Sequence, residues 1–357
     1  MVEFRKQKIS DERFEAASVA DIDNDGQLEI ISGEYIYKAP DWSKTRFREV
    51  KPEGEYFNDF GDLPLDVNGN GRLDIVTGAW WEKTLKWIEN PGLHGEWKTH
   101  DIDECGSIET LRLFDIDGDG EMEVFPNTPG RPQAFYKLKK DSSNKPCGEF
   151  TKYVLQEEKS QHGMGFGDIN GNGRTDIVLR QGWLEAPEDI FSGHWTFHRE
   201  FDLGGASVPI IVMDVTGNGM NDLIVGQAHG YGLHWYEQGK DTNGSRTWTQ
   251  HVIDETASQY HDIQVADIDN DGKPEIITGK RYRAHNGNDP GSEDPVFVCY
   301  FKINNGTFEQ HFIDRGAPGE CSGTGIHFAI ADLNANGNLD IVAPGKDGLF
   351  LFENLGS

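Results

Sequence analysis

The sequence predicts an all-β fold, a seven-bladed β-propeller with four strands in each blade. One acidic nine-residue pattern recurs seven times, at spacings of 45, 49, 53, 46, 53 and 65 residues. Runs typical of strands, such as EIISG, DIVTG and DLIVG, follow the copies. One aromatic pattern precedes each copy and another follows it. Each repeat therefore holds about four short strands, which is the composition of a propeller blade.

The acidic pattern predicts a cation-binding loop in every blade. Oxygen-bearing side chains stand at positions 1, 3, 5 and 9, and glycine stands at position 6. Alternate oxygens on a tight turn converge on a hard cation, here Ca²⁺ or Mg²⁺. The predicted ligands are Asp21, Asp23, Asp25, Glu29, Asp66, Asn68, Asn70, Asp74, Asp115, Asp117, Asp119, Glu123, Asp168, Asn170, Asn172, Asp176, Asp214, Thr216, Asn218, Asp222, Asp267, Asp269, Asp271, Glu275, Asp332, Asn334, Asn336 and Asp340.

Two other interpretations of the loops are weaker. An EF-hand would need an acid at position 12, where none of the seven copies has one, and a nonapeptide β-helix would repeat every nine residues. The loops could also be acidic turns without a metal. If they bind metal, the four-carboxylate loops 1, 3 and 6 are expected to bind most tightly, and loop 5, with Thr216 at position 3, is expected to bind weakly.

The strand order within a blade follows from the patterns. Strand A precedes the loop, strand B follows it, then come strand C and an aromatic strand D. Residues 1–357 form one predicted domain, with blades starting near 15, 58, 109, 162, 208, 261 and 326. Blade 7 lacks its own strand D, and residues 2–9 carry that pattern, so they are expected to complete it. Histidines recur on strand D at 100, 198, 251 and 311, and we expect them to pack between neighbouring blades.

Composition excludes some classes of partner. The formal net charge is −28, which argues against nucleic acid as a partner. No apolar run is long enough to span a membrane. The N-terminus has no signal-peptide core, so the expected location is the cytoplasm unless a leader has been removed. Four scattered cysteines indicate neither a zinc–thiolate site nor a dense disulfide framework. Oligomeric state and cysteine pairing stay open.

The loops and strands resemble the FG-GAP/VCBS repeat family of integrin-like propellers. Four segments, at residues 161–176, 226–238, 279–291 and 325–354, are also similar to the propeller domain of aldos-2-ulose dehydratase and to propellers of rhamnosyl–glucuronate lyases. That resemblance implies β-elimination on a sugar, with zinc or calcium among central histidines. The fungal dehydratases carry cupin domains after the propeller, and the present sequence shows only the propeller pattern, so no cupin step is implied.

Unusual side chains gather on the face opposite the acidic loops, in the B–C turns and at the starts of strand A. His162 and His261 each stand six residues before the first aspartate of a loop, and His327 is one residue out of that register. The candidate catalytic residues are His162, His229, His261, His285, Tyr282, Arg281 and His327. The candidate substrate-binding residues are Arg283, Lys346, Arg180, Trp183, Trp80, Trp81 and Asp289.

Two chemistries suit these residues. Three imidazoles could hold Zn²⁺ or another divalent ion as a Lewis acid. Without a metal, a histidine or Tyr282 could remove a C–H proton while Arg281 stabilises the enolate. The sequence thus predicts a carbohydrate lyase or dehydratase, and leaves open a propeller that binds sugar or protein without catalysis.

Overall fold

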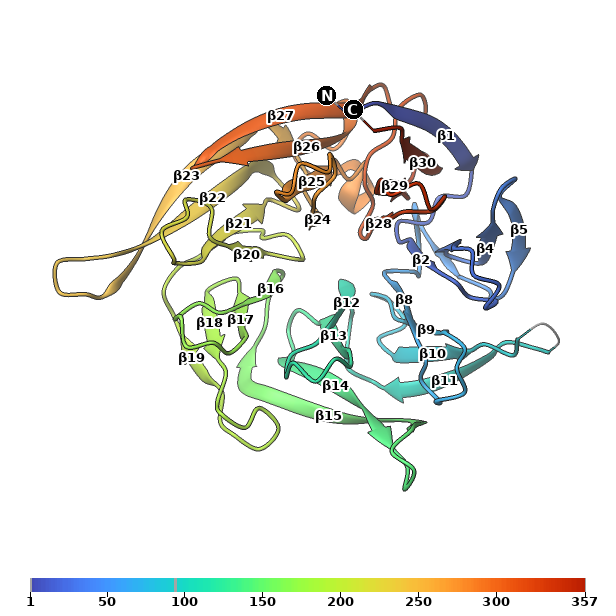
Figure 1. Cartoon of the computed structure of the whole chain (residues 1–357), viewed down its shortest axis with the longest axis horizontal. Helices are drawn as coiled ribbons and strands as arrows, with labels where there is room; N and C mark the ends of the chain where they lie inside the picture. The colour runs from blue at the N-terminus through green and yellow to red at the C-terminus, as the bar shows by residue number, and fades with distance from the viewer. Residues whose placement is uncertain (1, 93–94, 357) are drawn as a thin grey trace. The chain divides into compact units, whose positions relative to one another are not determined.

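The computed structural model describes residues 2–92 and 95–356, and these form seven four-stranded antiparallel sheets. Figure 1 shows the strands of each sheet lying side by side. A two-stranded hairpin, β6 (Pro52–Glu53) with β7 (Tyr56–Phe57), and one 3-10 turn, η1 (Ala284–Gly287), complete the regular elements of the described chain. The fold is that of a seven-bladed β-propeller, as the sequence predicts.

Each blade follows the predicted A–B–C–D order. Blade 1 comprises β2 (Ser18–Ala20), β3 (Glu29–Ser32), β4 (Tyr35–Lys38) and β5 (Ser43–Arg46); blade 2 comprises β8 (Asp62–Leu65), β9 (Asp74–Thr77), β10 (Leu85–Glu89) and β11 (Lys98–Asp103); blade 3 comprises β12 (Thr110–Phe114), β13 (Glu123–Asn127), β14 (Pro132–Lys140) and β15 (Pro146–Lys159). Blade 4 comprises β16 (Met164–Gly167), β17 (Asp176–Leu179), β18 (Gly182–Glu185) and β19 (Thr196–His198); blade 5 comprises β20 (Ile211–Met213), β21 (Asp222–Gly226), β22 (Tyr231–Lys240) and β23 (Arg246–Ser258); blade 6 comprises β24 (Ile263–Ala266), β25 (Glu275–Gly279), β26 (Val296–Asn304) and β27 (Thr307–Gly316).

The N-terminal strand completes blade 7, as the aromatic pattern predicts. Blade 7 comprises β28 (Ala329–Ala331), β29 (Asp340–Ala343), β30 (Leu349–Asn354) and β1 (Phe4–Ser10). Strand β1 pairs with β30 in antiparallel register from Phe4 opposite Asn354 onward. Strand β1 hydrogen-bonds to the outer edge of β30, so the backbone groups along that edge do not stay unpaired.

The chain divides into two compact units. The first contains the residues up to Lys159 together with those from Gly325 onward, which are blades 7, 1, 2 and 3. The second runs from Ser160 to Thr324 and contains blades 4, 5 and 6. The predicted single domain of 1–357 stays a prediction.

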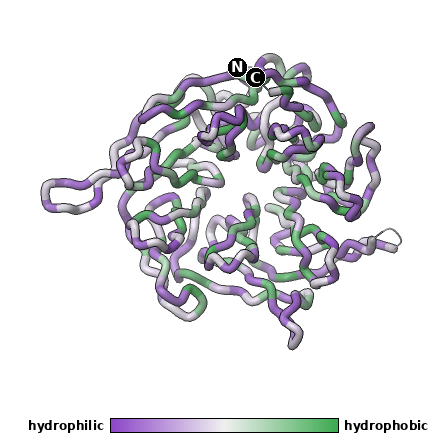
Figure 2. Tube along the Cα trace, viewed as in Figure 1, coloured by the Kyte–Doolittle hydropathy of each residue, from purple (hydrophilic) through white to green (hydrophobic). Residues whose placement is uncertain are grey.

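Apolar residues fill the spaces between neighbouring blades within each unit. In the second unit, one cluster joins Val178 and Trp183 of blade 4 to Leu223 and Val225 of blade 5. A second cluster joins blade 5 to blade 6 through Ile224, Trp235 and Ile276. Figure 2 shows that the projecting hairpin between β22 and β23 is hydrophilic, in contrast to these packed strands. Burial between blades therefore supplies the hydrophobic stabilisation that a single sheet lacks.

Three strand-D histidines stack on a tryptophan of strand C in their own blade, and each of these tryptophans belongs to an apolar cluster shared with the next blade. His100 lies opposite Trp87 of strand C, with ring centroids 4.3 Å apart and planes at 16°. The same pair recurs as His198 on Trp183 at 4.3 Å and His251 on Trp235 at 4.4 Å. The cause is the antiparallel register of strands C and D, which places the two rings directly opposite each other.

All seven acidic loops join strand A to strand B, as predicted, and they share one geometry. In loop 1 the Asp21 carboxylate accepts the N–H groups of Asp25 at 3.0 Å and Gly26 at 2.9 Å. Gly26 has φ of 87°, a left-handed conformation that favours glycine. The position-9 side chain turns inward, and Glu29 accepts the N–H of Ile22 at 2.9 Å. Position 9 therefore holds the loop to the sheet, a role that the cation-binding pattern alone does not indicate.

Candidate metal centre

Three histidines of the second unit come together from three blades. His162 stands two residues before β16, His261 stands two residues before β24, and His229 lies in the turn between β21 and β22. Each imidazole offers a ring nitrogen, and the three nitrogens lie within 4.8 Å of one another. The turn and the two strand starts share one edge of the blades, opposite the acidic loops. The convergence predicted for these three residues is confirmed within this unit.

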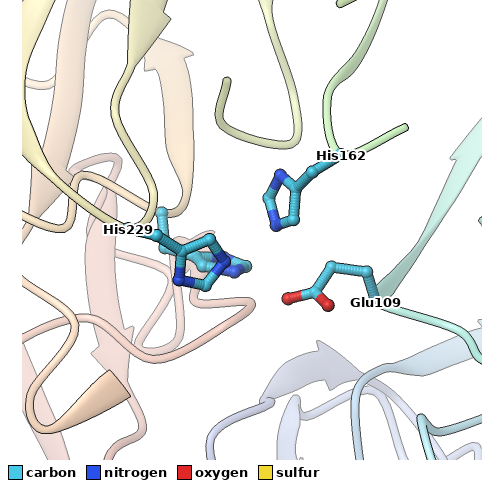
Figure 3. A group of neighbouring side chains, drawn as sticks. Glu109, His162 and His229 are labelled. Atoms are coloured by element: carbon cyan, nitrogen blue, oxygen red, sulfur yellow. The ribbon is translucent and has the colours of Figure 1, made fainter. Parts of the chain in front are cut away.

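The three rings are set at steep angles to one another. The centroids of His162 and His229 are 5.0 Å apart, with planes at 83°, and those of His162 and His261 are 5.2 Å apart at 89°. Figure 3 shows the His162 and His229 rings in this arrangement. The three rings meet edge to face, and one nitrogen of each lies within 4.8 Å of the others. This geometry separates the cluster from the stacked pairs of strands C and D.

Acceptors on the outer side of the cluster fix two of the rings. The Nδ1 atom of His162 lies 2.5 Å from the carbonyl oxygen of Ala206. The Nδ1 atom of His229 lies 2.8 Å from Oδ2 of Asp289. A carbonyl accepts only from an N–H, so Nδ1 of His162 carries the proton and Nε2 keeps its lone pair. A carboxylate or carbonyl on the far nitrogen is the usual support of a metal-ligating histidine.

Asp289 binds a second histidine with its other oxygen. Nδ1 of His285 lies 2.8 Å from Oδ1 of Asp289, and the His285 ring stacks on His229 with centroids 4.3 Å apart. Burial raises the pKa of the Asp289 carboxyl, but the hydrogen bonds from His229 and His285 outweigh it and the pKa is lowered overall. His229, His285 and Asp289 also bring three potential ligand atoms within 4.8 Å. Asp289, predicted as a substrate-binding residue, contacts two of the histidines.

The turn that carries His285 and Asp289 has an unusual backbone. Arg283, His285 and Asn286 all have positive φ, at 49°, 48° and 58°, although none is glycine. Left-handed conformations at non-glycine residues cost free energy and persist only where surrounding contacts impose them. Here the Arg283 N–H donates to Ser292 O at 3.1 Å, and the Ser292 N–H donates to Asp289 O at 3.1 Å.

Lys280 anchors the base of this turn. Its side chain is buried, with 1% of the residue exposed, and Nζ donates to Ser258 Oγ at 2.8 Å, Gln259 Oε1 at 2.7 Å and Gly291 O at 2.5 Å. Burial lowers the pKa of Lys280 to about 8, and Asp294 and Asp289 offset part of that effect. Lys280 therefore holds the two ends of the turn together and does not face a ligand, although the sequence places it in a basic surface turn.

The other cations of the turn differ in exposure. Arg281 is only 2% exposed, and its backbone N–H donates to Gln259 O at 3.0 Å. Arg283 is half-buried and forms an ion pair with Glu293. Tyr282 is half-buried, while 59% of the His285 side chain is exposed. Of this group, His285 is therefore the one most open to a ligand.

Two other candidate substrate-binding residues of the second unit are held by neighbouring side chains. Trp183 is 1% exposed, because it stacks on His198 and packs in the core between blades 4 and 5. It offers no accessible ring face to a sugar, so the interpretation of Trp183 as a substrate-binding residue is wrong. Arg180 donates from Nε to Asp202 at 3.0 Å.

The remaining candidates belong to the first unit. Trp81 is 38% exposed and rests against Tyr56 and Phe60, with centroids 5.4 Å and 5.7 Å away. The Lys346 ammonium lies 3.9 Å from the Tyr56 ring centroid and 3.5 Å from Glu15 Oε2, and its side chain is buried. Trp80 is half-buried and packs on the cluster of Tyr56 and Phe60.

His327 also belongs to the first unit. It is half-buried, and its carbonyl accepts the N–H of Ala17 at 2.8 Å. Burial, and next the nearby Arg112, lower the pKa of His327 well below 6.5. A neutral imidazole at neutral pH follows from this environment.

Comparisons with known proteins agree with the fold. Residues 66–125 and 214–278 match the FG-GAP-like repeat. No curated protein sequence matches significantly. BBS1N, in its crystal structure with ARL6DN soaked with mercury, is similar over 98% of this chain and 96% of its own, with a TM-score of 0.54 and 9% identity. The Vibrio cholerae biofilm matrix protein Bap1 aligns over 96% of this chain and 77% of its own, with a TM-score of 0.38 and 12% identity. At such identity the likeness to BBS1N concerns the fold alone. In the described chain, no helix is long and apolar enough to cross a membrane.

Proposed function

We propose that the second unit holds a divalent transition-metal ion on His162, His229 and His261. The observation that carries this proposal is the edge-on meeting of three imidazole nitrogens within 4.8 Å. Neutral imidazoles are ligands that suit zinc and its neighbours better than calcium. The supports at Ala206 and Asp289 fit a ligating role for His162 and His229.

We further propose that the chain is a carbohydrate lyase that works by β-elimination. The metal ion, when bound, would supply Lewis-acid polarisation of a carbonyl or carboxylate. His285 is the candidate general base because its ring is exposed and Asp289 accepts from its Nδ1. It would take the proton from the carbon next to that carbonyl, a carbon–carbon double bond would form, and the β carbon–oxygen bond would break. The departing oxygen would take up a proton, and Tyr282 is the candidate donor.

The sugar as substrate is supported by the sequence resemblance to aldos-2-ulose dehydratase and rhamnosyl–glucuronate lyases. Arg283 adds a cation at the exposed end of the same turn, where it could bind a sugar carboxylate in place of Glu293. Glu293 is itself mostly exposed, so exchange of one carboxylate for another is feasible there. The substrate is thus expected to be a keto-sugar or a uronic-acid saccharide.

The test combines metal analysis with product detection. The purified protein is analysed for zinc, manganese and other first-row metals, and then assayed on keto-sugars and uronides for the absorbance of an unsaturated product. We expect one transition-metal ion per chain and turnover in the wild type. His162→Ala and His285→Ala should each lose turnover, but only His162→Ala should lose the metal. Full turnover in both variants would refute the assigned site.

A non-catalytic sugar-binding propeller is the second candidate. Trp81 supports it, because this exposed indole is braced by Tyr56 and Phe60 in the first unit and could stack on a sugar ring. This alternative predicts saccharide binding without a chemical change, and loss of that binding in Trp81→Ala. Product formation that survives Trp81→Ala but not His285→Ala would favour the lyase.

A further inference from the structure

One position on strand C differs between blades in step with the acidic loops. In each blade the residue that follows loop position 9 pairs with a residue of strand C, for example Ile30 with Tyr37 and Ile75 with Ile88. The next residue along strand C is lysine in blades 1, 3 and 6 and glutamate in the other four. By these registers the lysines are Lys38, Lys137 and Lys302, and the glutamates are Glu89, Glu185, Glu237 and Glu353.

The lysines occur only in the blades whose loops have four carboxylates. Loops 1, 3 and 6 carry acids at positions 1, 3, 5 and 9, and one lysine leaves each with a formal charge of −3. The other four loops carry only two acids at these positions, and the strand-C glutamate brings each of them to −3 as well. All seven loops thus reach the same formal charge by two different routes. A solvated lysine with no role in the loop would not follow the loop composition in this way.

The structure shows where the lysine ammonium goes. Nζ of Lys137 lies 3.0 Å from Asp117, 2.9 Å from Asp119 and 2.5 Å from Glu123, which are positions 3, 5 and 9 of loop 3. Its side chain is 17% exposed, so this is a partly buried contact. An ammonium has three donors, and here three carboxylates receive them.

The other two four-carboxylate loops repeat the contact. Nζ of Lys38 pairs with Asp23 and lies 2.8 Å from Asp25, again positions 3 and 5. Nζ of Lys302 pairs with Asp269 and lies 3.3 Å from Asp271, the same positions in loop 6. The ammonium therefore contacts the same loop oxygens that a metal ion would need.

The strand-C glutamates behave in the opposite way. Glu185 accepts from the position-3 amide of Asn170 at 2.9 Å and Glu353 accepts from that of Asn334 at 3.2 Å. Their second oxygens bind strand-D cations or imidazoles, Arg5 for Glu353 and His198 for Glu185. The strand-C position that holds an ammonium in blades 1, 3 and 6 thus holds a carboxylate in these two blades.

We propose that Lys38, Lys137 and Lys302 are the resident cations of loops 1, 3 and 6, in place of a divalent metal ion. A divalent ion at these loops would meet a positive charge already bound to positions 3 and 5, and it would have to displace that charge to reach its ligands. The four-carboxylate loops are then the weakest Ca²⁺ sites of the seven, not the tightest as their carboxylate count predicts. The proposal departs from the prediction based on carboxylate count for loops 1, 3 and 6 only.

Counting bound calcium tests the proposal. Chelator-treated full-length protein is dialysed against a fixed excess of Ca²⁺, and bound Ca²⁺ is measured by elemental analysis. The triple variant K38M/K137M/K302M should bind three more Ca²⁺ ions per chain than the wild type. Each single variant should bind one more. The matched control is Lys86→Met, which removes a strand-C lysine of blade 2 that pairs with Glu82 and not with a loop, and it should leave the number unchanged.

Thermal melting gives a second, independent measurement. Without the ammonium, three or four carboxylates repel one another, so each single variant should melt at a lower temperature than the wild type in chelator. Added Ca²⁺ should restore most of that loss. Equal numbers of bound Ca²⁺ in wild type and single variants would overturn the proposal. It would also be overturned if the variants lost stability that Ca²⁺ did not restore.

Discussion

Two groups of three histidines differ in how the ring meets its neighbours. His100, His198 and His251 lie flat on a strand-C aromatic ring, and each contacts a glutamate of the same strand. His162, His229 and His261 meet edge to face, from three different blades of one unit. His229 also stacks on His285, with centroids 4.3 Å apart and planes at 16°, so a stacked face alone does not mark a structural histidine. The second group is distinguished by ring nitrogens from three blades that lie within 4.8 Å of one another.

The sharpest test of this comparison removes one ring from each group. His261→Ala should abolish binding of the transition metal to the second unit, since only two of the three imidazoles remain. His198→Ala should leave the metal content unchanged. The measurement is elemental analysis of both variants after dialysis against a fixed zinc concentration. Metal loss in His198→Ala, or retention in His261→Ala, would contradict the division into two groups.

The turn that supplies His285 depends on a buried charge, whereas the stacked histidines depend on strand pairing. The pKa of Lys280 is about 8 in the folded protein and about 10.5 in the unfolded chain, so between these values the unfolded chain binds more protons. The free energy of unfolding should therefore rise with pH from about 8 to 10.5. Over that window the wild type should gain up to about 3 kcal/mol relative to Lys280→Met.

Urea unfolding of wild type and Lys280→Met across this pH range measures the difference. Lys44→Met serves as the control, since that lysine is 41% exposed and pairs with Glu12 at the surface. A difference between wild type and Lys280→Met that stays flat with pH would show that Lys280 keeps its ordinary pKa.

Asp289 tests whether the outer contacts of the metal centre matter. Asp289→Asn keeps the size and shape of the side chain. It replaces the charged carboxylate, which accepts from His229 and His285, by a neutral amide. Loss of such an outer partner typically reduces metal affinity about 10- to 100-fold. Competition against a chromogenic zinc chelator gives the affinity. An unchanged affinity would show that the Asp289 contact does not support the metal ligands.

The smallest expected effect concerns the stacked group itself. His198→Ala removes a ring stacked on Trp183 and a contact with Glu185, and it should lower the free energy of unfolding by about 1–2 kcal/mol. Phenylalanine at this position should recover the stacking part of the loss. Urea denaturation measures both variants, and an alanine variant as stable as the wild type would leave the stacking without a measurable role.

Much of the fold could be predicted because its signals are local. The loop pattern fixes the A–B turn through contacts within nine residues, such as Asp21 with Gly26, and the strand patterns lie directly beside it. The pairing of β1 with β30 was also predictable, because the same aromatic pattern marks every strand D. The blade starts near 162, 208 and 261 agree with the observed strands of the second unit.

The site was less predictable because its details depend on packing between distant residues. The register of His162 and His261 before their loops correctly predicted their meeting. The burial of Trp183 and Lys280 depends on which face of a strand or turn packs inward, and neither residue type shows this in the sequence. The role of Asp289 depends on a left-handed turn at His285 and Asn286. The Asn286–Gly287 pair marks a turn in the sequence, but a histidine at 285 does not signal a positive φ.

The pairing of β1 with β30 has a consequence for how this protein is made. Arg5 and Glu353, which contact each other across that pair, are 348 positions apart in the chain. During synthesis β1 leaves the ribosome long before β30 exists, so its backbone donors and acceptors lack that partner until β30 has been translated. Blade 7 cannot be completed before β30 has been translated, and a chain truncated before β30 keeps β1 without its partner strand.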